Sequence, residues 1–180
     1  MVSPFFNNNG PFKFNEILKD LDLKLDEKNE DLIITDIKDL QNSQLNEITF
    51  FHSKKYSFAA KNTKASFCIT TQNLSDELPI NCKPIIVDNV LVSTSIITAK
   101  FYPDSINDSF DTTIEEISNT KFNDKVKFGK NVLIGQNVSI GPNCFIGHNT
   151  IIEKNVIIGD NCSIGSNTIV RNTLIKNNVK

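Results

Sequence analysis

The stretch VKFGKN-VLIGQN-VSIGPN-CFIGHN-TIIEKN-VIIGDN-CSIGSN-TIVRNT, residues 126–173, decides the fold of this chain. It repeats every six residues. Gly follows the third place in most hexads, and Asn recurs in steps of six from Asn131 to Asn167. A period this short and regular indicates a solenoid rather than a globular domain. The third place is always aliphatic or Phe: Phe128, Ile134, Ile140, Ile146, Ile152, Ile158, Ile164 and Val170.

Each hexad has the pattern of a short strand followed by a bend. The first and third places alternate with a mixed second place, which is the strand period of two. Gly lets two backbones come close at a corner, and Asn tolerates a left-handed backbone. No apolar spacing of three and four persists, which excludes a helix. Three such sides make a coil of 18 residues, and the sequence predicts a parallel β-helix of the hexapeptide type.

The repeat is short for a solenoid, which needs roughly three or more units and a capped end. Eight clear hexads give under three coils. Beyond Thr173 the register slips through Leu174, Ile175 and Lys176, and no capping pattern follows before Lys180. We therefore expect a truncated β-helix.

Composition favours a cytosolic protein that does not bind nucleic acid. Nineteen basic and 21 acidic residues leave a net charge of −2, without the basic stripe that nucleic-acid binding uses. There is no apolar run long enough for a membrane span and no signal-peptide pattern. The four cysteines lack metal-site spacing, so we expect them reduced, with Cys144 and Cys162 stacked one coil apart as small buried residues. No metal or cofactor is predicted.

The first two-thirds of the chain predict a compact α/β domain with a linker, residues 1–112, before the β-helix of residues 113–180. FNEILKDLDLKL, residues 14–25, has the spacing of a helix, with Asn15 as its cap. The polar stretch 102–113 is typical of a linker. Apolar runs of strand length lie at 31–37, 47–51, 65–71 and 83–89, with helices expected near 54–61 and 90–101.

Four landmarks together carry a resemblance: ITFFHSKKY (48–56), ASFCITT (65–71), PIIVDNV (84–90) and the hexads that begin at Ile117. With them the chain resembles the UDP-3-O-(3-hydroxyacyl)glucosamine N-acyltransferase family of lipid A synthesis. The resemblance implies a uridine-binding N-terminal domain and a left-handed β-helix that forms a homotrimer. It also implies transfer of a 3-hydroxyacyl group from acyl carrier protein to the 2-amine of UDP-3-O-acylglucosamine, without a cofactor, in the cytoplasm or at the periphery of the inner membrane.

The resemblance also implies a uracil site in the first landmark. Family members sandwich the base between a Phe and a Tyr six residues apart, which match Phe50 and Tyr56. Stacking of this kind contributes about 1–3 kcal/mol per base. By residue type alone, a place in a core strand is favoured for Phe50. The family has Asn-Pro between the two rings; Ser53 and Lys54 stand there, and the Ser53 hydroxyl can still donate and accept. Lys55 is either a phosphate contact or a solvated surface lysine.

The catalytic histidine of the family is not expected in this chain. Family members carry it in an Ile-Ala-His-Asn hexad that lies several coils later, and Ile146-Gly147-His148-Asn149 imitates that hexad. Polar residues fill the place before Asn in every regular hexad except VSIGPN, which has Pro142 there, so His148 is a solvated corner residue or, less simply, a general base. His52 follows the strand that carries Phe50 and is a candidate ligand contact. The chain should bind but not catalyse, and the length of the acyl chain cannot be read from it.

Two other classes fit the hexads. One is a sugar-nucleotide N-acetyltransferase that uses acetyl-CoA; the other is a non-catalytic β-helix that serves as a binding module. A bare scaffold should show a regular Thr or charged ladder at the outward second place, and none is present. Several second-place residues are instead apolar, which suits packing between subunits of a trimer: Leu133, Phe145, Ile151 and Ile157.

Overall fold

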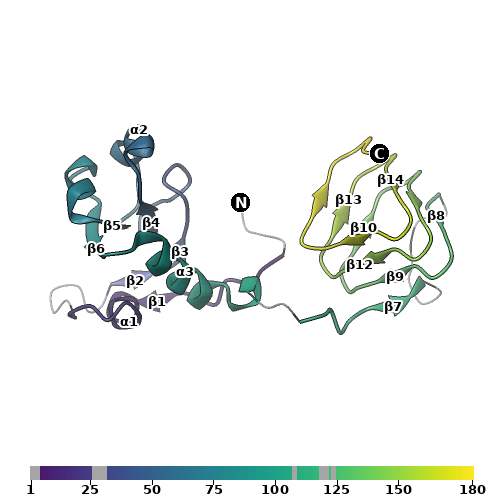
Figure 1. The fold of residues 1–180 in the computed structure, drawn as a ribbon, viewed down its shortest axis with the longest axis horizontal. Helices are drawn as coiled ribbons and strands as arrows, with labels where there is room; N and C mark the ends of the chain where they lie inside the picture. The colour runs from purple at the N-terminus through teal and green to yellow at the C-terminus, as the bar shows by residue number, and fades with distance from the viewer. Residues whose placement is uncertain (1–4, 26–31, 107–108, 118–121, 123–124) are drawn as a thin grey trace. The chain divides into compact units, whose positions relative to one another are not determined.

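The computed structural model describes residues 5–25, 32–106, 109–117, 122 and 125–180. The chain divides between residues 107 and 108 into two compact units. The first is an α/β unit and the second is built from the hexads (Figure 1). The assignment of nucleotide binding to residues 1–112 and of a separate β-helix domain to 113–180 stays a prediction.

The α/β unit is built on a parallel sheet of four strands in the order β3-β4-β5-β6. A separate antiparallel pair joins β1 to β2. The elements are β1 (Phe12–Lys13), α1 (Phe14–Asp20), β2 (Ile33–Ile34), β3 (Asp36–Ile37), β4 (Glu47–Phe51), the 3-10 helix η1 (Lys54–Tyr56), α2 (Ser57–Lys61), β5 (Phe67–Thr70), η2 (Gln72–Glu77), β6 (Lys83–Ile86), α3 (Val90–Phe101) and η3 (Pro103–Ile106).

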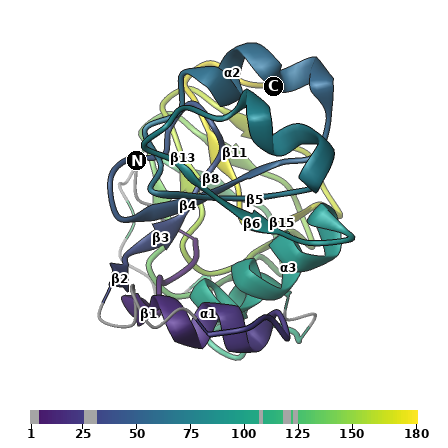
Figure 2. The same cartoon turned by 90° about the vertical axis from the view of Figure 1, so that its left-hand side faces the viewer.

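Both faces of the sheet are covered, because successive side chains of a strand point to opposite faces. Along β5, Phe67 and Ile69 join the core beneath α1 and α3, where the rings of Phe14 and Phe67 stack with centroids 4.0 Å apart. Cys68 points the other way, into the smaller core beneath α2 and η2. The sheet therefore lies between two helical layers (Figures 1 and 2).

The strands and helices of this unit largely follow the sequence. The predicted bounds of β4 and α3 are confirmed. The run 31–37, whose first residue lies outside the described residues, is interrupted at Thr35, so that β2 pairs with β1 and β3 pairs with β4. The predicted cap Asn15 is wrong: α1 begins at Phe14, whose backbone N–H is bound by the carbonyl of Leu32 and whose ring is buried. Packing, rather than a capping side chain, fixes the start of this helix.

The second unit is a parallel β-helix. Its strands stack into three sheets, β10-β13-β16, β14-β11-β8 and β15-β12-β9-β7, and β7 alone runs antiparallel to its neighbour. The strands are β7 (Glu115–Glu116), β8 (Lys127–Phe128), β9 (Leu133–Ile134), β10 (Ser139–Ile140), β11 (Phe145–Ile146), β12 (Ile151–Ile152), β13 (Ile157–Ile158), β14 (Ser163–Ile164), β15 (Ile169–Val170) and β16 (Leu174–Ile175).

The predicted coil of 18 residues is confirmed, since Phe145 lies in register between Lys127 and Ser163. The third-place residues fill the interior, and the cysteines stack as expected: the Cys162 backbone N–H lies 3.3 Å from the Sγ of Cys144. The Sγ of Cys144 also lies 3.1 Å from the carbonyl oxygen of Gly159, and that of Cys162 lies 3.1 Å from the carbonyl oxygen of Lys176. These cysteines are therefore weak donors to corner carbonyls as well as buried apolar residues.

The corners use Asn and Gly as predicted. Every sixth-place Asn from Asn131 to Asn167 has a positive φ, between 55° and 62°. Their side chains hydrogen-bond from coil to coil, as from Asn149 to Asn167 at 3.2 Å. None of the glycines has a positive φ; a Cβ on Gly147 would instead lie 2.6 Å from the carbonyl carbon of Gly165 in the next coil. Gly is needed for close approach and Asn for the left-handed turn.

The predicted slip of register beyond Thr173 is confirmed, and it amounts to one residue. Leu174 pairs with Ile157, a step of 17 residues instead of 18, so one residue is missing from a single corner. Asn172 adopts a positive φ of 47° in that shortened corner, and Asn178 resumes the pattern with a φ of 64°. The coil therefore continues through β16.

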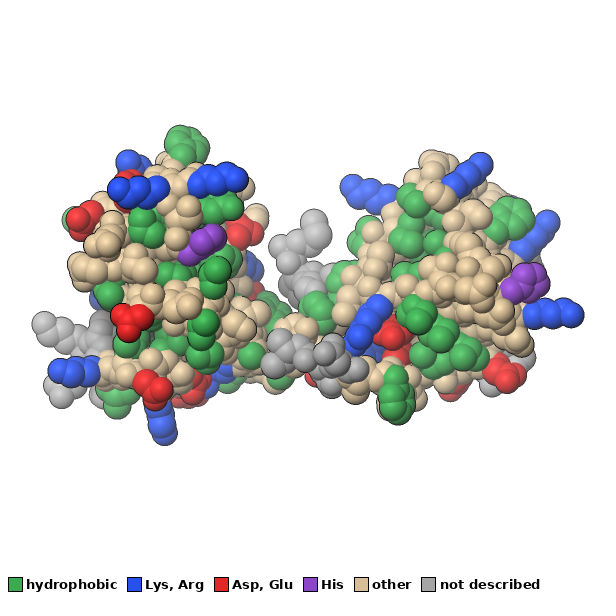
Figure 3. Space-filling model, in the orientation of Figure 1, with side chains coloured by type: hydrophobic (Ala, Val, Ile, Leu, Met, Phe, Trp, Pro, Cys, Tyr) green, Lys and Arg blue, Asp and Glu red, His purple; other side chains and the backbone are tan. Residues whose placement is uncertain are grey.

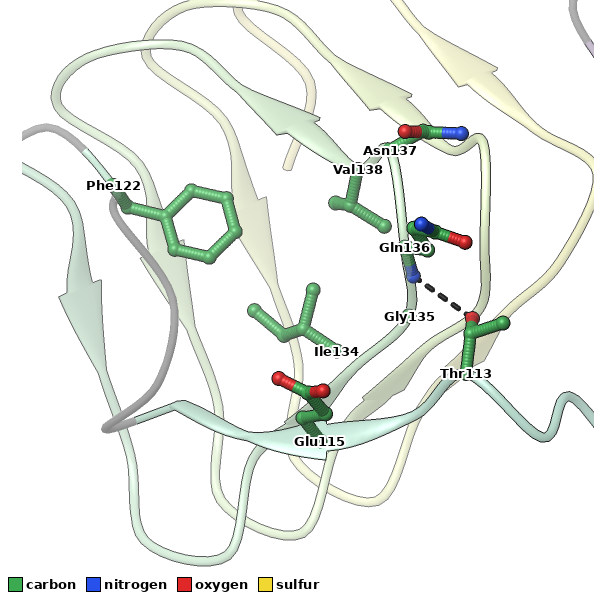
Figure 4. Close-up of a pocket in the computed structure, with 8 residues that line it drawn as sticks. All are labelled: Thr113, Glu115, Phe122, Ile134, Gly135, Gln136, Asn137 and Val138. Carbon is green, nitrogen blue, oxygen red and sulfur yellow. Dashed lines mark hydrogen bonds between the residues drawn. The ribbon is translucent and has the colours of Figure 1, made fainter.

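The end of the expected linker is part of the β-helix. Asp111 is buried, and its carboxylate accepts hydrogen bonds from Thr113 and from the backbone N–H of Lys154 at 2.7 Å. The Thr113 hydroxyl accepts from the backbone N–H of Gln136 at 2.9 Å (Figure 4). Burial by itself would raise the pKa of Asp111, but these hydrogen bonds outweigh it and the pKa is lowered. The prediction that 102–113 is only a linker is therefore wrong for these two residues.

Candidate functional site

A cavity of ≈ 320 Å³ opens in the α/β unit. Its volume falls within the range of about 300–1,000 Å³ typical of small-molecule sites. Most of its lining is apolar or aromatic, with a few polar groups. The lining residues are Asp39, Leu40, Gln41, Phe50, His52, Tyr56 and Ala59.

The cavity lies where two parallel strands end. The loop residues 39–41 follow the carboxyl end of β3. Phe50 is the next-to-last residue of β4, and His52 comes directly after that strand. Tyr56 and Ala59 come from η1 and α2, which follow β4 along the chain. Ligands of open α/β sheets bind outside the carboxyl ends of the strands, and the cavity occupies such a place.

The aromatic residues form the part of the lining suited to a flat ligand. Phe50 is half-buried and packs against the main core, whereas the Tyr56 side chain is 42% exposed. The ring centroids of His52 and Tyr56 lie 5.4 Å apart at an interplanar angle of 48°, and the Lys55 Nζ lies 5.9 Å from the Tyr56 centroid. A partly exposed tyrosine and a fixed phenylalanine that line one cavity can hold a planar ring by stacking.

The loop at the rim of the cavity is held by Asp39. One carboxylate oxygen accepts the backbone N–H groups of Gln41 and Asn42, at 2.9 and 3.0 Å, and the other accepts the Asn42 side-chain amide at 2.7 Å. Partial burial by itself would raise the pKa of Asp39, but the hydrogen bonds from Asn42 and Gln41 outweigh it and the pKa is lowered. The loop is thus fixed by an ionised side chain that bonds its own backbone two residues on.

Of the residues singled out from the sequence, Phe50, Tyr56 and His52 come together in this cavity, and Ser53 and Lys55 are not part of its lining. The Ser53 hydroxyl accepts the backbone N–H of Lys55 at 3.4 Å and caps η1. Sequence reasoning missed Asp39, Leu40 and Gln41. The signal was present, because these residues directly follow a predicted parallel strand, where sites of α/β sheets occur.

His148 occupies a corner of the β-helix. Its Nδ1 accepts the backbone N–H of Lys130 at 2.7 Å, and its own backbone N–H donates to the Ser166 hydroxyl at 3.0 Å. A neutral imidazole has a single acceptor nitrogen. That nitrogen accepts the Lys130 backbone N–H, so it does not face a substrate in this geometry. The geometry fits the structural interpretation of His148 rather than that of a general base.

Within the described ranges, no group of three or more His, Cys, Asp and Glu side chains is placed to hold a metal ion. The same part of the chain contains no helix that is both long and apolar enough to cross a membrane. On the face of the molecule in Figure 3, acidic and basic side chains are interspersed.

Both halves of the chain are similar to known families. Residues 31–99 match the LpxD family model, described as UDP-3-O-(3-hydroxymyristoyl) glucosamine N-acyltransferase. Residues 137–172 match the model for the bacterial transferase hexapeptide, six repeats. The predicted resemblance is confirmed. So is the fold class, an α/β unit followed by a left-handed parallel β-helix.

Curated relatives named UDP-3-O-acylglucosamine N-acyltransferase are similar over part of the chain. The protein of Rickettsia rickettsii (strain Sheila Smith) is 42% identical over 76 residues, which are 42% of this chain and 22% of the relative. That of Rickettsia akari (strain Hartford) is 37% identical over 89 residues, 48% of this chain and 26% of the relative. That of Rickettsia prowazekii (strain Madrid E) is 35% identical over 102 residues, 56% of this chain and 30% of the relative. The matched segments thus span less than a third of these relatives.

The family match contains the whole candidate site. Every residue that lines the cavity lies between positions 39 and 59, inside the matched range 31–99. The similarity and the cavity therefore concern the same segment of the chain.

Proposed function

We propose that this chain serves in lipid A synthesis as a UDP-3-O-acylglucosamine N-acyltransferase, which transfers a 3-hydroxyacyl group from acyl carrier protein to the 2-amine of the sugar nucleotide. The family match over residues 31–99 and the names of the curated relatives support this proposal. The hexapeptide match supports an acyltransferase β-helix as the second part. The proposed reaction would place the protein in the cytoplasm or at the periphery of the inner membrane.

The observation that carries the proposal is the aromatic cavity inside the family match. Phe50 and Tyr56 are the two rings that the resemblance assigns to uracil, and both line one cavity at the carboxyl edge of the sheet. In this proposal the base lies between the two rings. The α/β unit then anchors the nucleotide, and the reacting amine lies further along the substrate. Lys55, outside the cavity lining, is kept as a proposed contact to phosphate.

Catalysis is assigned to none of the residues of this chain. Attack of an amine on a thioester needs a base that takes up the amine proton, and the acceptor nitrogen of His148 is already bound by Lys130. We propose that the chain by itself binds the nucleotide without transferring the acyl group.

A homotrimer is part of the proposal. Leu133, Ile151 and Ile169 follow one another in register on the outer face of β9, β12 and β15, and Ile169 is 66% exposed. Leu174 and Phe145 on the other two sheets are 49% and 52% exposed. A column of apolar side chains on a β-helix suits contact with two further copies of the chain.

Nucleotide titrations test the uracil site. Tyr56→Ala should weaken binding of UDP by about 1–3 kcal/mol, roughly 5- to 150-fold, measured by isothermal titration calorimetry. Phe58→Ala is the matched control, because Phe58 lies on the neighbouring α2, is 84% exposed and does not line the cavity. Far-ultraviolet circular dichroism verifies that both variants fold. Absence of UDP binding to the unaltered chain, or equal affinity in Tyr56→Ala, contradicts the proposed site.

Sedimentation velocity tests the trimer. Ile169→Asp should shift the chain toward monomer, since it introduces a charge into the apolar column. Gln136→Asp, at an exposed corner of the β-helix outside the apolar column, should leave the association unchanged. If the unaltered chain sediments only as a monomer, the proposed homotrimer is contradicted.

A further inference from the structure

Stacking between two aromatic rings does not explain how the site would select one nucleobase over the others. Stacking depends little on the identity of the base, because every base has a π-face. Phe50 and Tyr56 would therefore hold any nucleobase. Discrimination requires hydrogen-bonding groups at the edge of the base, and removing one such partner leaves a group unpaired. The lining of the cavity contains three polar side chains besides Tyr56: Asp39, Gln41 and His52.

Of these three polar groups, Asp39 is engaged by hydrogen bonds and His52 is an aromatic ring packed against Tyr56. Both carboxylate oxygens of Asp39 accept hydrogen bonds from its own loop. The ring of His52 packs against that of Tyr56, so that His52 extends the aromatic wall. Ser53, which occupies the family's Asn position, lies outside the lining and uses its hydroxyl to cap η1.

Gln41 differs from the others in having a fixed backbone and an uncommitted side chain. Its backbone N–H is held by Asp39 at 2.9 Å. Its carboxamide makes no hydrogen bond within the part of the chain that the structure describes. A carboxamide offers one acceptor oxygen and two donor hydrogens on adjacent atoms. A residue whose main chain is anchored and whose side chain is free is well placed to read a ligand.

We propose that Gln41 reads the imide edge of the base, in the role for which Ser53 is unsuited. The carboxamide oxygen of Gln41 accepts the N3–H of uracil, and its NH2 group donates to a carbonyl oxygen next to N3. The Asp39 carboxylate holds the loop in place, and Phe50 and Tyr56 hold the plane of the base. This inference rests on the proposed nucleotide site, because it assigns the edge of the ligand whose faces that site stacks.

A ligand with a blocked edge tests the assignment. Uridine 5′-monophosphate and its N3-methyl analogue have the same faces and phosphate, but the methyl group removes the N3–H. The unaltered chain should bind uridine monophosphate about 3- to 10-fold more tightly than the analogue. Gln41→Met, which keeps the length of the side chain and removes its hydrogen bonds, should bind both ligands with equal affinity. His52→Phe, which keeps a ring against Tyr56, should retain the preference.

The outcomes separate this inference from the site on which it rests. If Tyr56→Ala weakens binding of uridine monophosphate while Gln41→Met still discriminates against the analogue, the stacking site stands and the assignment of Gln41 is overturned. Loss of discrimination in His52→Phe instead of Gln41→Met also overturns it. If the unaltered chain does not bind uridine monophosphate, the proposed site and the assignment fall together. Thermal melting of each variant verifies that binding is compared between folded proteins.

Discussion

The two histidines of this chain, one in each unit, show how differently the two regions use the same residue. His148 stands in a hexad that imitates a catalytic motif, yet its ring accepts a backbone N–H from the coil below. His52 belongs to no catalytic motif, yet its ring lines a cavity beside Tyr56. In the β-helix a polar side chain is explained by its place in the repeat. In the α/β unit each polar side chain has to be explained by its own neighbours.

The largest expected effect concerns the corners of the β-helix. A methyl group on Gly147 would lie 2.6 Å from the carbonyl carbon of Gly165 in the next coil, whereas one on Gly165 would have its nearest neighbour, the Thr168 hydroxyl, at 3.7 Å. Gly147→Ala should lower the free energy of unfolding by about 1–3 kcal/mol through overpacking, and Gly165→Ala should change it little. Urea titrations of the two variants give the comparison. Equal destabilisation by both would contradict close approach as the reason for Gly.

How much could be predicted from the sequence also differs between the regions. The period of six gave the strands, the coil length and the left-handed Asn corners, because one rule applies to every hexad. The slip of register beyond Thr173 was predicted too, but sequence alone does not show that a corner can shorten by one residue while β13 and β16 still pair. The anchoring of Asp111 was missed for a related reason: its partner, Lys154, is 43 residues away.

In the α/β unit, the strands and α3 were predictable from apolar runs, and the cavity only in part. Phe50 and Tyr56 were found through the resemblance. Gln41 was not, because its place depends on two parallel strands ending at the same edge of the sheet. Ser53 was expected at the ligand because a hydroxyl stands in the family's Asn position, but a hydroxyl two residues before a free backbone N–H readily caps it.

A smaller effect on stability is expected for the α/β unit in alkaline solution. The Tyr102 hydroxyl donates to the Asp36 carboxylate at 2.6 Å in the α/β unit, and burial together with that carboxylate raises the pKa of Tyr102 to about 12. Since the pKa in the folded state exceeds the ordinary value of 10.0, the contribution of Tyr102 is full below pH 10 and is lost as the pH rises to 12. Tyr102→Phe should be less stable than the unaltered chain by about 1 kcal/mol at pH 7.

The stability difference between the chain and Tyr102→Phe should then shrink between pH 10 and pH 12. The pKa of Lys38 is also raised, chiefly by its hydrogen bond to Glu47 against the opposing effect of burial, and Lys38 likewise loses its contribution at high pH. Lys38 is present in both proteins, so its loss cancels in the difference apart from its coupling to Tyr102 through Asp36, which lies 3.4 Å from the Lys38 Nζ. Urea midpoints at pH 7, 10 and 12 provide the measurement; a difference that stays constant over this range would show that Tyr102 does not titrate as its contact with Asp36 requires.

The smallest expected change returns to the two histidines. His148→Ala removes the acceptor for the Lys130 backbone N–H, but Lys130 is exposed and water can replace the bond, so the free energy of unfolding should fall by only about 0.5 kcal/mol. UDP affinity should not change. His52→Ala should do the reverse: unchanged stability, because the side chain is exposed, and weaker UDP binding, because one wall of the cavity beside Tyr56 is lost. Calorimetric titration and urea unfolding of both variants check the pair, and a drop in UDP affinity in His148→Ala would mean that the repeat alone does not account for that residue.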